Sequence, residues 1–198
     1  MAEKTPTKPP VKRRKTVDKW KNKKWFHILA PASFSHRLIG ETPAEESEKM
    51  VGRIISVSAR DLTGNIKKTQ VMLNFRVLDV QGTNANTIFD SMHVQTGALK
   101  RLVRRRSSKV ESVDDVVTKD GVRARVKSLA LTAGRMSQSQ QTAVRKIMHD
   151  NMVAFALESE YEGLLHSLVL GDGTTATSQA AHKISPLKRV DVIKIRRI

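Results

Sequence analysis

Six cationic side chains stand within ten residues near the middle of the chain, and no acidic residue separates them. They are Lys100, Arg101, Arg104, Arg105, Arg106 and Lys109. A helix beginning at Thr96 would place four of them, at positions 100, 101, 104 and 105, on one face, since such positions are neighbours at 3.6 residues per turn. The opposite face would carry Leu99, Leu102 and Val103. Planar guanidinium groups suit phosphate oxygens and guanine edges, so we favour a nucleic-acid contact here over a merely solvated basic face.

A second group of cations lies near the amino terminus and is mixed with aromatic residues. Its cations are Lys12, Arg13, Arg14, Lys15, Lys19, Lys21, Lys23 and Lys24. Ammonium groups can follow an RNA backbone while an indole stacks on an unpaired base, and Trp20 is the stacking candidate. We expect Trp25 and Phe26 instead to anchor this segment in the core. A basic run of this kind is also compatible with a nuclear import signal.

Two further basic groups lie in predicted strands. Arg123 and Arg125, with Lys127, share one face of their strand because side chains alternate with a period of two. The carboxy-terminal group consists of Lys188, Arg189, Lys194, Arg196 and Arg197. Four separated basic groups favour contact with a folded RNA over recognition of a single groove.

The residues that would support catalysis or cofactor binding lack the necessary spacing. The six His residues show no metal-ligand pattern, and the chain has no cysteine, which excludes disulfides, Cys-ligated metals and a thiol nucleophile. Asp114 and Asp115 are adjacent on a predicted strand, so they would point to opposite faces. The Gly171–Gly173 segment is interpreted as a helix stop. We therefore expect no enzyme, no cofactor, no metal and no small-molecule substrate.

The overall charge limits the kinds of molecule to which the chain could bind. The chain has 198 residues, with 36 Lys and Arg against 19 Asp and Glu, a formal net charge of +17. Such an excess indicates a polyanionic partner, either nucleic acid or anionic lipid. No apolar run approaches the length of about 20 residues that a membrane span requires, and no segment pairs a strong apolar face with a basic one in the way that a helix lying in a membrane interface requires. We expect a cytosolic protein without membrane contact.

The chain divides by composition into a tail and a body. Residues 1–24 contain ten Lys or Arg, three Pro and few apolar residues, which predicts a disordered basic tail that binds RNA. Residues 25–198 are predicted to form a single α+β domain, an antiparallel sheet or open β-barrel with helices packed at one side. Its predicted strands cover residues 53–60, 70–80, 87–94, 110–117, 122–131 and 189–196. The turn residues 61–65 and 119–121 predict two hairpins.

Helix signals occur at several places. Ser137 followed by Gln140 predicts a capping box at the start of the longest helix. Further helices are predicted over residues 42–49, 161–170 and 179–183.

Residues 147–173 contain five acidic residues and no Lys or Arg. This stretch is either a solvated acidic surface or a contact with a basic neighbouring protein.

Several collinear blocks resemble one known family. They are Lys23-Lys24-Trp25-Phe26, Gly52-Arg53-Ile54, Asp79-Val80-Gln81-Gly82, Thr118-Lys119-Asp120-Gly121 and Pro186-Leu187. Together they resemble the archaeal and eukaryotic small-subunit ribosomal proteins of the S-one-e family, also called S-three-A-e, over residues 20–198. Ser56, Ala59 and Ser185 depart from the family pattern at packing positions.

The resemblance implies a structural protein on the platform of the small ribosomal subunit, near the messenger exit and the 3′ end of the subunit's RNA. The implied partners are small-subunit ribosomal RNA, neighbouring platform proteins and, near the exit, messenger RNA. The implied location is the cytoplasmic ribosome. The chain lacks the longer ends of eukaryotic members, so an archaeal source is expected. The alternative is a free-standing RNA chaperone or regulator acting off the ribosome.

Overall fold

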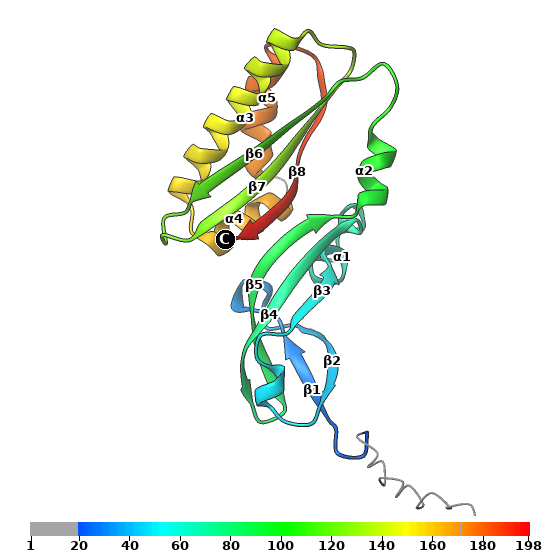
Figure 1. Ribbon diagram of the computed structural model, residues 1–198, viewed down its shortest axis with the longest axis vertical. Coiled ribbons are helices and arrows are strands. Elements are labelled where there is room, and N and C mark those ends of the chain that lie inside the picture. Colours follow the sequence, from blue (N-terminus) through cyan, green and yellow to red (C-terminus); the bar gives the residue numbers. More distant parts are fainter. Residues whose placement is uncertain (1–19, 171) are drawn as a thin grey trace, which may run out of the picture.

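The computed structural model describes residues 20–170 and 172–198 and shows an elongated α+β molecule (Figure 1). The strands are β1 (Lys24–Leu29), β2 (Leu38–Ala44), β3 (Ile54–Ser58), β4 (Val71–Gln81), β5 (Asn84–Val94), β6 (Lys109–Val117), β7 (Arg123–Thr132) and β8 (Leu187–Arg197). The helices are α1 (Ala59–Thr63), α2 (Thr96–Leu102), α3 (Gln138–Glu158), α4 (Tyr161–Leu170) and α5 (Thr175–His182). Short 3-10 turns η1 (Ala32–Phe34), η2 (Glu48–Met50), η3 (Ile66–Lys68) and η4 (Asp172–Thr174) complete the described elements.

The long strand β5 joins two halves of the molecule, an amino-terminal half made of β1 to β5 and a carboxy-terminal half made of β6 to β8 with α3 to α5. One edge of β5 pairs with β4 along its length, and β3 pairs with β4. The other edge pairs with β1 at its beginning, where the two strands run parallel, and with β8 at its end. From β8 the sheet continues to β7 and then to β6. The predicted α+β class with an open sheet is confirmed, with the parallel β1–β5 pair as the departure from an all-antiparallel sheet.

Helices α3 and α5 cover one face of the sheet in the carboxy-terminal half. Helices α3 and α5 lie behind β6, β7 and β8, while α2 lies on the other side of these strands (Figure 1). The largest buried cluster combines Phe75 and Phe89 of the amino-terminal half with Val126, Met152 and Leu164 of the carboxy-terminal half. One apolar core therefore runs through both halves.

Local sequence signals account for most of these elements. Ser137 caps α3, and the Gln140 side chain accepts a hydrogen bond from the Ser137 backbone in return, so the predicted capping box is confirmed. The hairpin of β6 and β7 forms as predicted around Gly121, whose φ of +73° suits glycine. The hairpin of β3 and β4 also forms, although α1 and η3 lie in its connection.

The helix predicted over residues 42–49 is wrong. Thr42 and Pro43 belong to strand β2, where they pair with Phe26 and Trp25, and only the short turn η2 follows. A helix of about eight residues is marginal without packing, and pairing with β1 supplies the backbone hydrogen bonds instead. Proline is tolerated because β2 is an edge strand, with β1 as its one partner in the described sheet.

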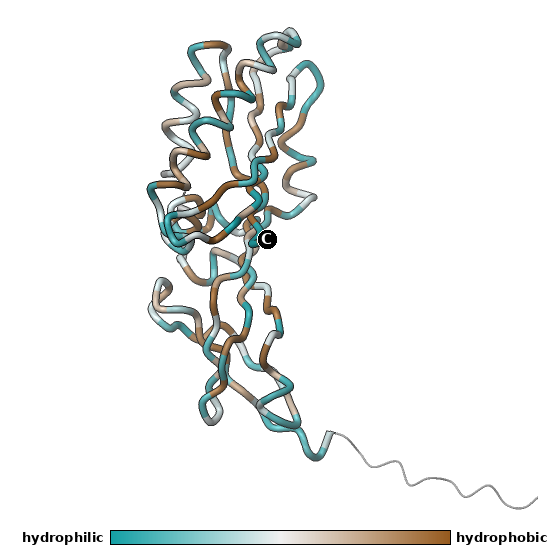
Figure 2. The backbone as a smooth tube through the Cα atoms, turned by 60° about the vertical axis from the view of Figure 1, so that its left-hand side comes forward, coloured by the Kyte–Doolittle hydropathy of each residue, from teal (hydrophilic) through white to brown (hydrophobic). Residues whose placement is uncertain are grey.

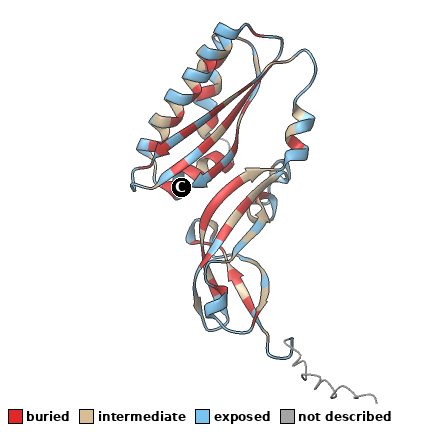
Figure 3. Cartoon of the chain, in the orientation of Figure 1, coloured by how far each residue is buried: buried red, intermediate tan, exposed pale blue. Residues whose placement is uncertain are grey.

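A β-bulge in β8 determines which of its side chains point away from α3 and α5. Lys127 pairs with Lys194, but the next residue, Ser128, pairs with Val192, so Ile193 is the extra residue. The bulge places Ile193 beside Leu129 and Leu131 and places Lys194 opposite Lys127. Figure 3 shows the contrast between the buried positions along these strands and the exposed positions of α2.

Candidate nucleic-acid interface

The face of strands β6, β7 and β8 that α3 and α5 leave uncovered is called here the open face. Strand register brings four of its cations together as two rows, Arg125 opposite Arg196 and Lys127 opposite Lys194. Like charges directly opposite each other on neighbouring strands destabilise a sheet. The protein therefore carries an unfavourable concentration of positive charge here, of the kind that a bound polyanion neutralises.

Acidic residues on the edge strand β6 neutralise one side of these rows. Asp115 accepts two hydrogen bonds from Arg125, at 2.6 Å from Nε and 2.8 Å from Nη2. These bonds lower the pKa of Asp115 and raise that of Arg125. Glu111 pairs with Lys109 and with Lys127, the latter at 3.0 Å, and hydrogen bonds from these lysines lower the pKa of Glu111.

The two β8 cations have no such partner. Within the described residues, no ion pair joins Lys194 or Arg196 to an acidic side chain. Both side chains are exposed. Arg123, exposed on the same face, is likewise in no ion pair among the described residues, so the charges of Arg123, Lys194 and Arg196 are available to a ligand.

The open face is hollowed where these residues meet. A depression of about 510 Å³ is lined by Val113, Arg125, Lys127, Lys194, Arg196, Arg197 and Ile198. The exposed Val113 gives it an apolar margin on β6. The predicted cations Arg123, Arg125 and Arg196 thus come from segments about 70 residues apart in sequence and share one surface.

Helix α2 covers the other end of the same face. Its Leu99 and Leu102 pack against Leu129, Leu131 and Ile193. The predicted apolar face of this helix is therefore confirmed for these two leucines. Figure 2 shows hydrophobic and hydrophilic stretches alternating along the strands of this half.

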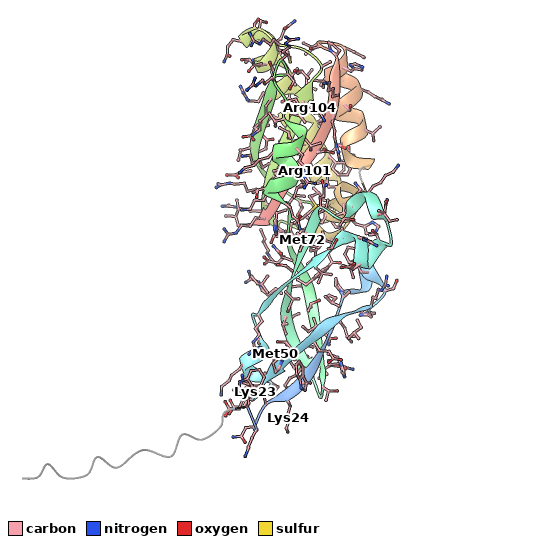
Figure 4. All side chains as sticks on the ribbon, turned by 90° about the vertical axis from the view of Figure 1, so that its right-hand side faces the viewer. Lys23, Lys24, Met50, Met72, Arg101 and Arg104 are labelled. Atoms are coloured by element: carbon pink, nitrogen blue, oxygen red, sulfur yellow. The ribbon has the colours of Figure 1, made fainter. Side chains whose placement is uncertain are left out.

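The predicted basic helix face at residues 100–105 is only partly correct. The N-cap position is held by Gln95 rather than by Thr96, without a side-chain capping hydrogen bond, and the helix ends at Leu102. Lys100 and Arg101 are exposed on α2, whereas Arg104, Arg105 and Arg106 follow in a turn in which Arg106 has a φ of +69°. Figure 4 shows Arg101 and Arg104 along one side of the molecule. All five remain exposed, but they form a helix end and a turn instead of a continuous helical stripe.

The amino-terminal basic group lies at the opposite end of the molecule. Lys23 and Lys24 stand far from Arg101 and Arg104 in Figure 4. Trp20 is 63% exposed, with the Lys23 ammonium 3.8 Å from the centre of its ring. Lys21 and Lys24 are also exposed. The predicted contacts at Lys12, Arg13, Arg14, Lys15 and Lys19 lie outside the described residues, and so does most of the predicted tail.

The two aromatic residues expected to anchor the tail behave differently. Phe26 is 5% exposed and packs with Ile28 and Met50, as predicted. Trp25 is 58% exposed, so its predicted burial is wrong. Successive residues of β1 point to opposite faces, and only one of the two can reach the core.

The predicted carboxy-terminal group is divided. Arg196 and Arg197 line the hollow, whereas Lys188 and Arg189 lie at the beginning of β8. Arg189 is paired with Asp191 and lies near Lys67 and Lys68 of η3. These two cations therefore belong to a separate surface.

Two negative findings concern the described residues alone. Within residues 20–170 and 172–198, no group of three or more His, Cys, Asp or Glu residues could hold a metal ion. No helix in that part of the chain is long and apolar enough to cross a bilayer. As predicted, Asp114 and Asp115 point to opposite faces, because Asp114 is buried beside His149 while Asp115 is exposed.

Comparison with known proteins identifies the family. Residues 11–198 match the model of the ribosomal S3Ae family. The chain belongs to this family. A relative from Staphylothermus marinus, named small ribosomal subunit protein eS1, is 37% identical over 186 residues, which cover 93% of this chain and 88% of the relative. Relatives of the same name from Sulfurisphaera tokodaii and Sulfolobus acidocaldarius are each 39% identical, over 90% of this chain and 93% and 91% of their own lengths.

Family membership gives the chain a structural role in the ribosome and no enzymatic one. The family predicted from the collinear blocks is thereby confirmed. Val113 and the paired acids Glu111 and Asp115 were absent from the predicted site. The alternation of residues 110–117 was the signal that could have placed them on the face opposite Asp114.

Proposed function

We propose that the chain is a structural component of the small ribosomal subunit and binds ribosomal RNA through the open face, with Lys100 and Arg101 of α2 extending the contact. The observation that carries the proposal is the pair of like-charged rows, in which Lys194 and Arg196 have no acidic partner among the described residues. Phosphate groups of folded RNA would neutralise both cations and release counterions. The names of the relatives support the small subunit as the site of action.

Resemblance to the family also supports a proposed position within the subunit. We place the protein on the platform, near the messenger exit and the 3′ end of the small-subunit RNA, in the cytoplasmic ribosome. Neighbouring platform proteins and, at the exit, messenger RNA are the further partners. The exposed acidic residues Asp150, Glu158, Glu160 and Glu162 offer a surface to a basic neighbouring protein. Crosslinking in cells, followed by sequencing of the attached RNA, tests this position: attachment to other regions of the RNA would contradict it.

The RNA-binding role is tested by reversing charge on the open face. The double variant Lys194→Glu, Arg196→Glu is compared with Lys146→Glu, Lys183→Glu, which makes the same change in net charge at exposed positions on α3 and at the end of α5. We expect the first variant to leave purified small subunits at lower salt than the second. Its salt dependence should be shallower by about 0.7 to 0.9 in log K per log salt for each phosphate group that the variant no longer neutralises.

Equal release of both variants would contradict an RNA contact through the open face. The sedimentation of the unmodified chain decides between the ribosomal role and a free-standing RNA chaperone. A structural subunit protein co-sediments with the small subunit in stoichiometric amounts after a moderate salt wash. Material that sediments free of the particle would favour the chaperone.

A further inference from the structure

The open face is chemically divided between its edge strand and its inner strands. Beyond Lys109 and Glu111, the residues of β6 on this face are Val113, Asp115 and Val117, with the two valines 59% and 46% exposed. On β7 and β8 the corresponding residues are cations. A surface that only neutralised phosphates would gain nothing from exposed valines along one margin.

Arg125 differs from the other cations of this face because its guanidinium is fixed. Nε and Nη2 both donate to the two oxygens of Asp115, at 2.6 and 2.8 Å. A bidentate pair of this kind is planar, and both side chains remain 57% exposed. Arg125 is thus held by Asp115, which lies between Val113 and Val117 on β6, instead of being free to reach for phosphate. A fixed guanidinium plane is a surface on which an RNA base can stack.

The spacing of the inner strands suits the sugar–phosphate backbone beside such a base. Strands lie about 4.8 Å apart, so β8 and β6 are separated by about 10 Å, within the reach of one nucleotide from phosphate to base. Lys194 and Arg196 are two residues apart along β8, about 7 Å, and can hold successive phosphates of an extended strand. The hollow of about 510 Å³ that these residues line lies in the size range of small-ligand sites.

We infer that the Arg125–Asp115 pair is a stacking platform for one unpaired base of the bound RNA, and that Lys194 and Arg196 hold the phosphates beside that base. This inference rests on the proposed RNA-binding function and adds the class of nucleotide that the site takes. A paired base offers only its edge at the surface of a duplex, so the platform selects single-stranded or extruded nucleotides.

Two conservative substitutions separate stacking from charge. Arg125→Lys keeps the charge but removes the planar group, whereas Arg196→Lys keeps the charge of a phosphate ligand and leaves the platform intact. The probes are an oligouridylate and an oligonucleotide of the same length and charge whose central residues are abasic, each titrated with the full chain. The unmodified chain and Arg196→Lys should prefer the oligouridylate by about tenfold. Arg125→Lys should lose that preference.

Each outcome bears on one proposal. Equal affinity of the unmodified chain for both probes, or loss of the preference in Arg196→Lys but not in Arg125→Lys, would overturn the stacking platform. Unchanged affinity of the double variant Lys194→Glu, Arg196→Glu for both probes would instead count against the proposed function. A thermal melt of each variant verifies that the fold is retained.

A second measurement needs no variant. Photoactivated 4-thiouridine placed at the centre of the oligouridylate should crosslink to a peptide that contains Val113, Asp115 or Arg125. A crosslink confined to Trp20 or to α2 would place the base elsewhere and overturn the inference.

Discussion

The two faces of the sheet formed by β6, β7 and β8 are built by the same strands and have opposite energetic roles. On the covered face, Val126 and Ala130 of β7 are fully buried against α3, α4 and α5. On the open face, Arg125 and Lys127 stand opposite Arg196 and Lys194. Burial of apolar surface on the covered face stabilises the fold, while the like-charged rows of the open face oppose it. Stabilisation of the fold and the proposed binding of RNA therefore belong to different sides of one layer.

The largest effect is expected on the covered face. Met148 of α3 is fully buried in a cluster with Val110, Ala130 and Val144. Met148→Ala should lower the free energy of unfolding by about 2–5 kcal/mol, since it removes apolar contacts and leaves a cavity. Val113→Ala, on the open face, should change it by less than about 0.5 kcal/mol. Urea denaturation of both variants measures the difference, and comparable losses would remove the contrast between the faces.

The amino-terminal cap of α3, the helix that packs on the covered face, is tested next. Ser137→Ala removes the hydroxyl that accepts a hydrogen bond from the Gln140 backbone and should lower stability by about 1 kcal/mol. Ser137→Asp keeps a capping acceptor and places negative charge at the helix amino terminus, so it should retain stability. Thermal denaturation compares the two variants. A larger loss for Asp than for Ala would show that the cap does not act through its acceptor.

A stabilising substitution is expected on the open face. Lys194→Glu places a carboxylate opposite Lys127 and removes one pair of like charges, so the free energy of unfolding should rise by about 0.2–1 kcal/mol. The same variant should bind RNA more weakly. Denaturation at low and high salt measures the gain, which should shrink as salt screens the charges. A destabilised Lys194→Glu would mean that the rows do not oppose folding.

The smallest effect concerns the acid that partly balances the open face. The pKa of Glu111 lies below its ordinary value of 4.5 because Lys109 and Lys127 donate hydrogen bonds to the carboxylate. The interactions of Glu111 with these two lysines therefore stabilise the fold above pH 4.5, and this stabilisation is lost as the pH falls through the lowered pKa of Glu111 in the folded state. Glu111→Gln should reduce the acid-induced loss by less than about 1 kcal/mol. The free energy of unfolding is measured against pH for the unmodified chain and for Glu111→Gln, and identical curves below pH 4.5 would contradict this role of Glu111.

Local signals allowed much of the fold to be predicted from the sequence. The alternation of residues 123–127 placed Arg123 and Arg125 on one face, and Ser137 with Gln140 marked the start of α3. These features depend on neighbours within a few residues. The helix predicted at Thr42-Pro43 is wrong because these residues form a strand through pairing with β1. A local helix signal contains no information about that distant partner.

The composition of the open face could not be predicted because it depends on register between distant strands. Arg125 and Arg196 become neighbours only through the pairing of β7 with β8. The bulge at Ile193, which sets the position of Lys194, leaves no clear mark in a run of aliphatic and basic residues. The end of α2 at Leu102 was equally hidden, since Val103 and the following arginines continue a plausible helical pattern.

Strand β8 follows all the other described elements in the order of synthesis, yet it lies between β5 and β7 in the sheet. The two halves of the molecule can begin to collapse as the nascent chain emerges, but neither edge that receives β8 is satisfied until its eleven residues are available. Until then, β5 and β7 expose unpaired backbone groups that can mispair with other chains. Completion of this sheet is therefore a long-range event, and a newly made molecule is vulnerable to aggregation through β5 and β7 until β8 is inserted.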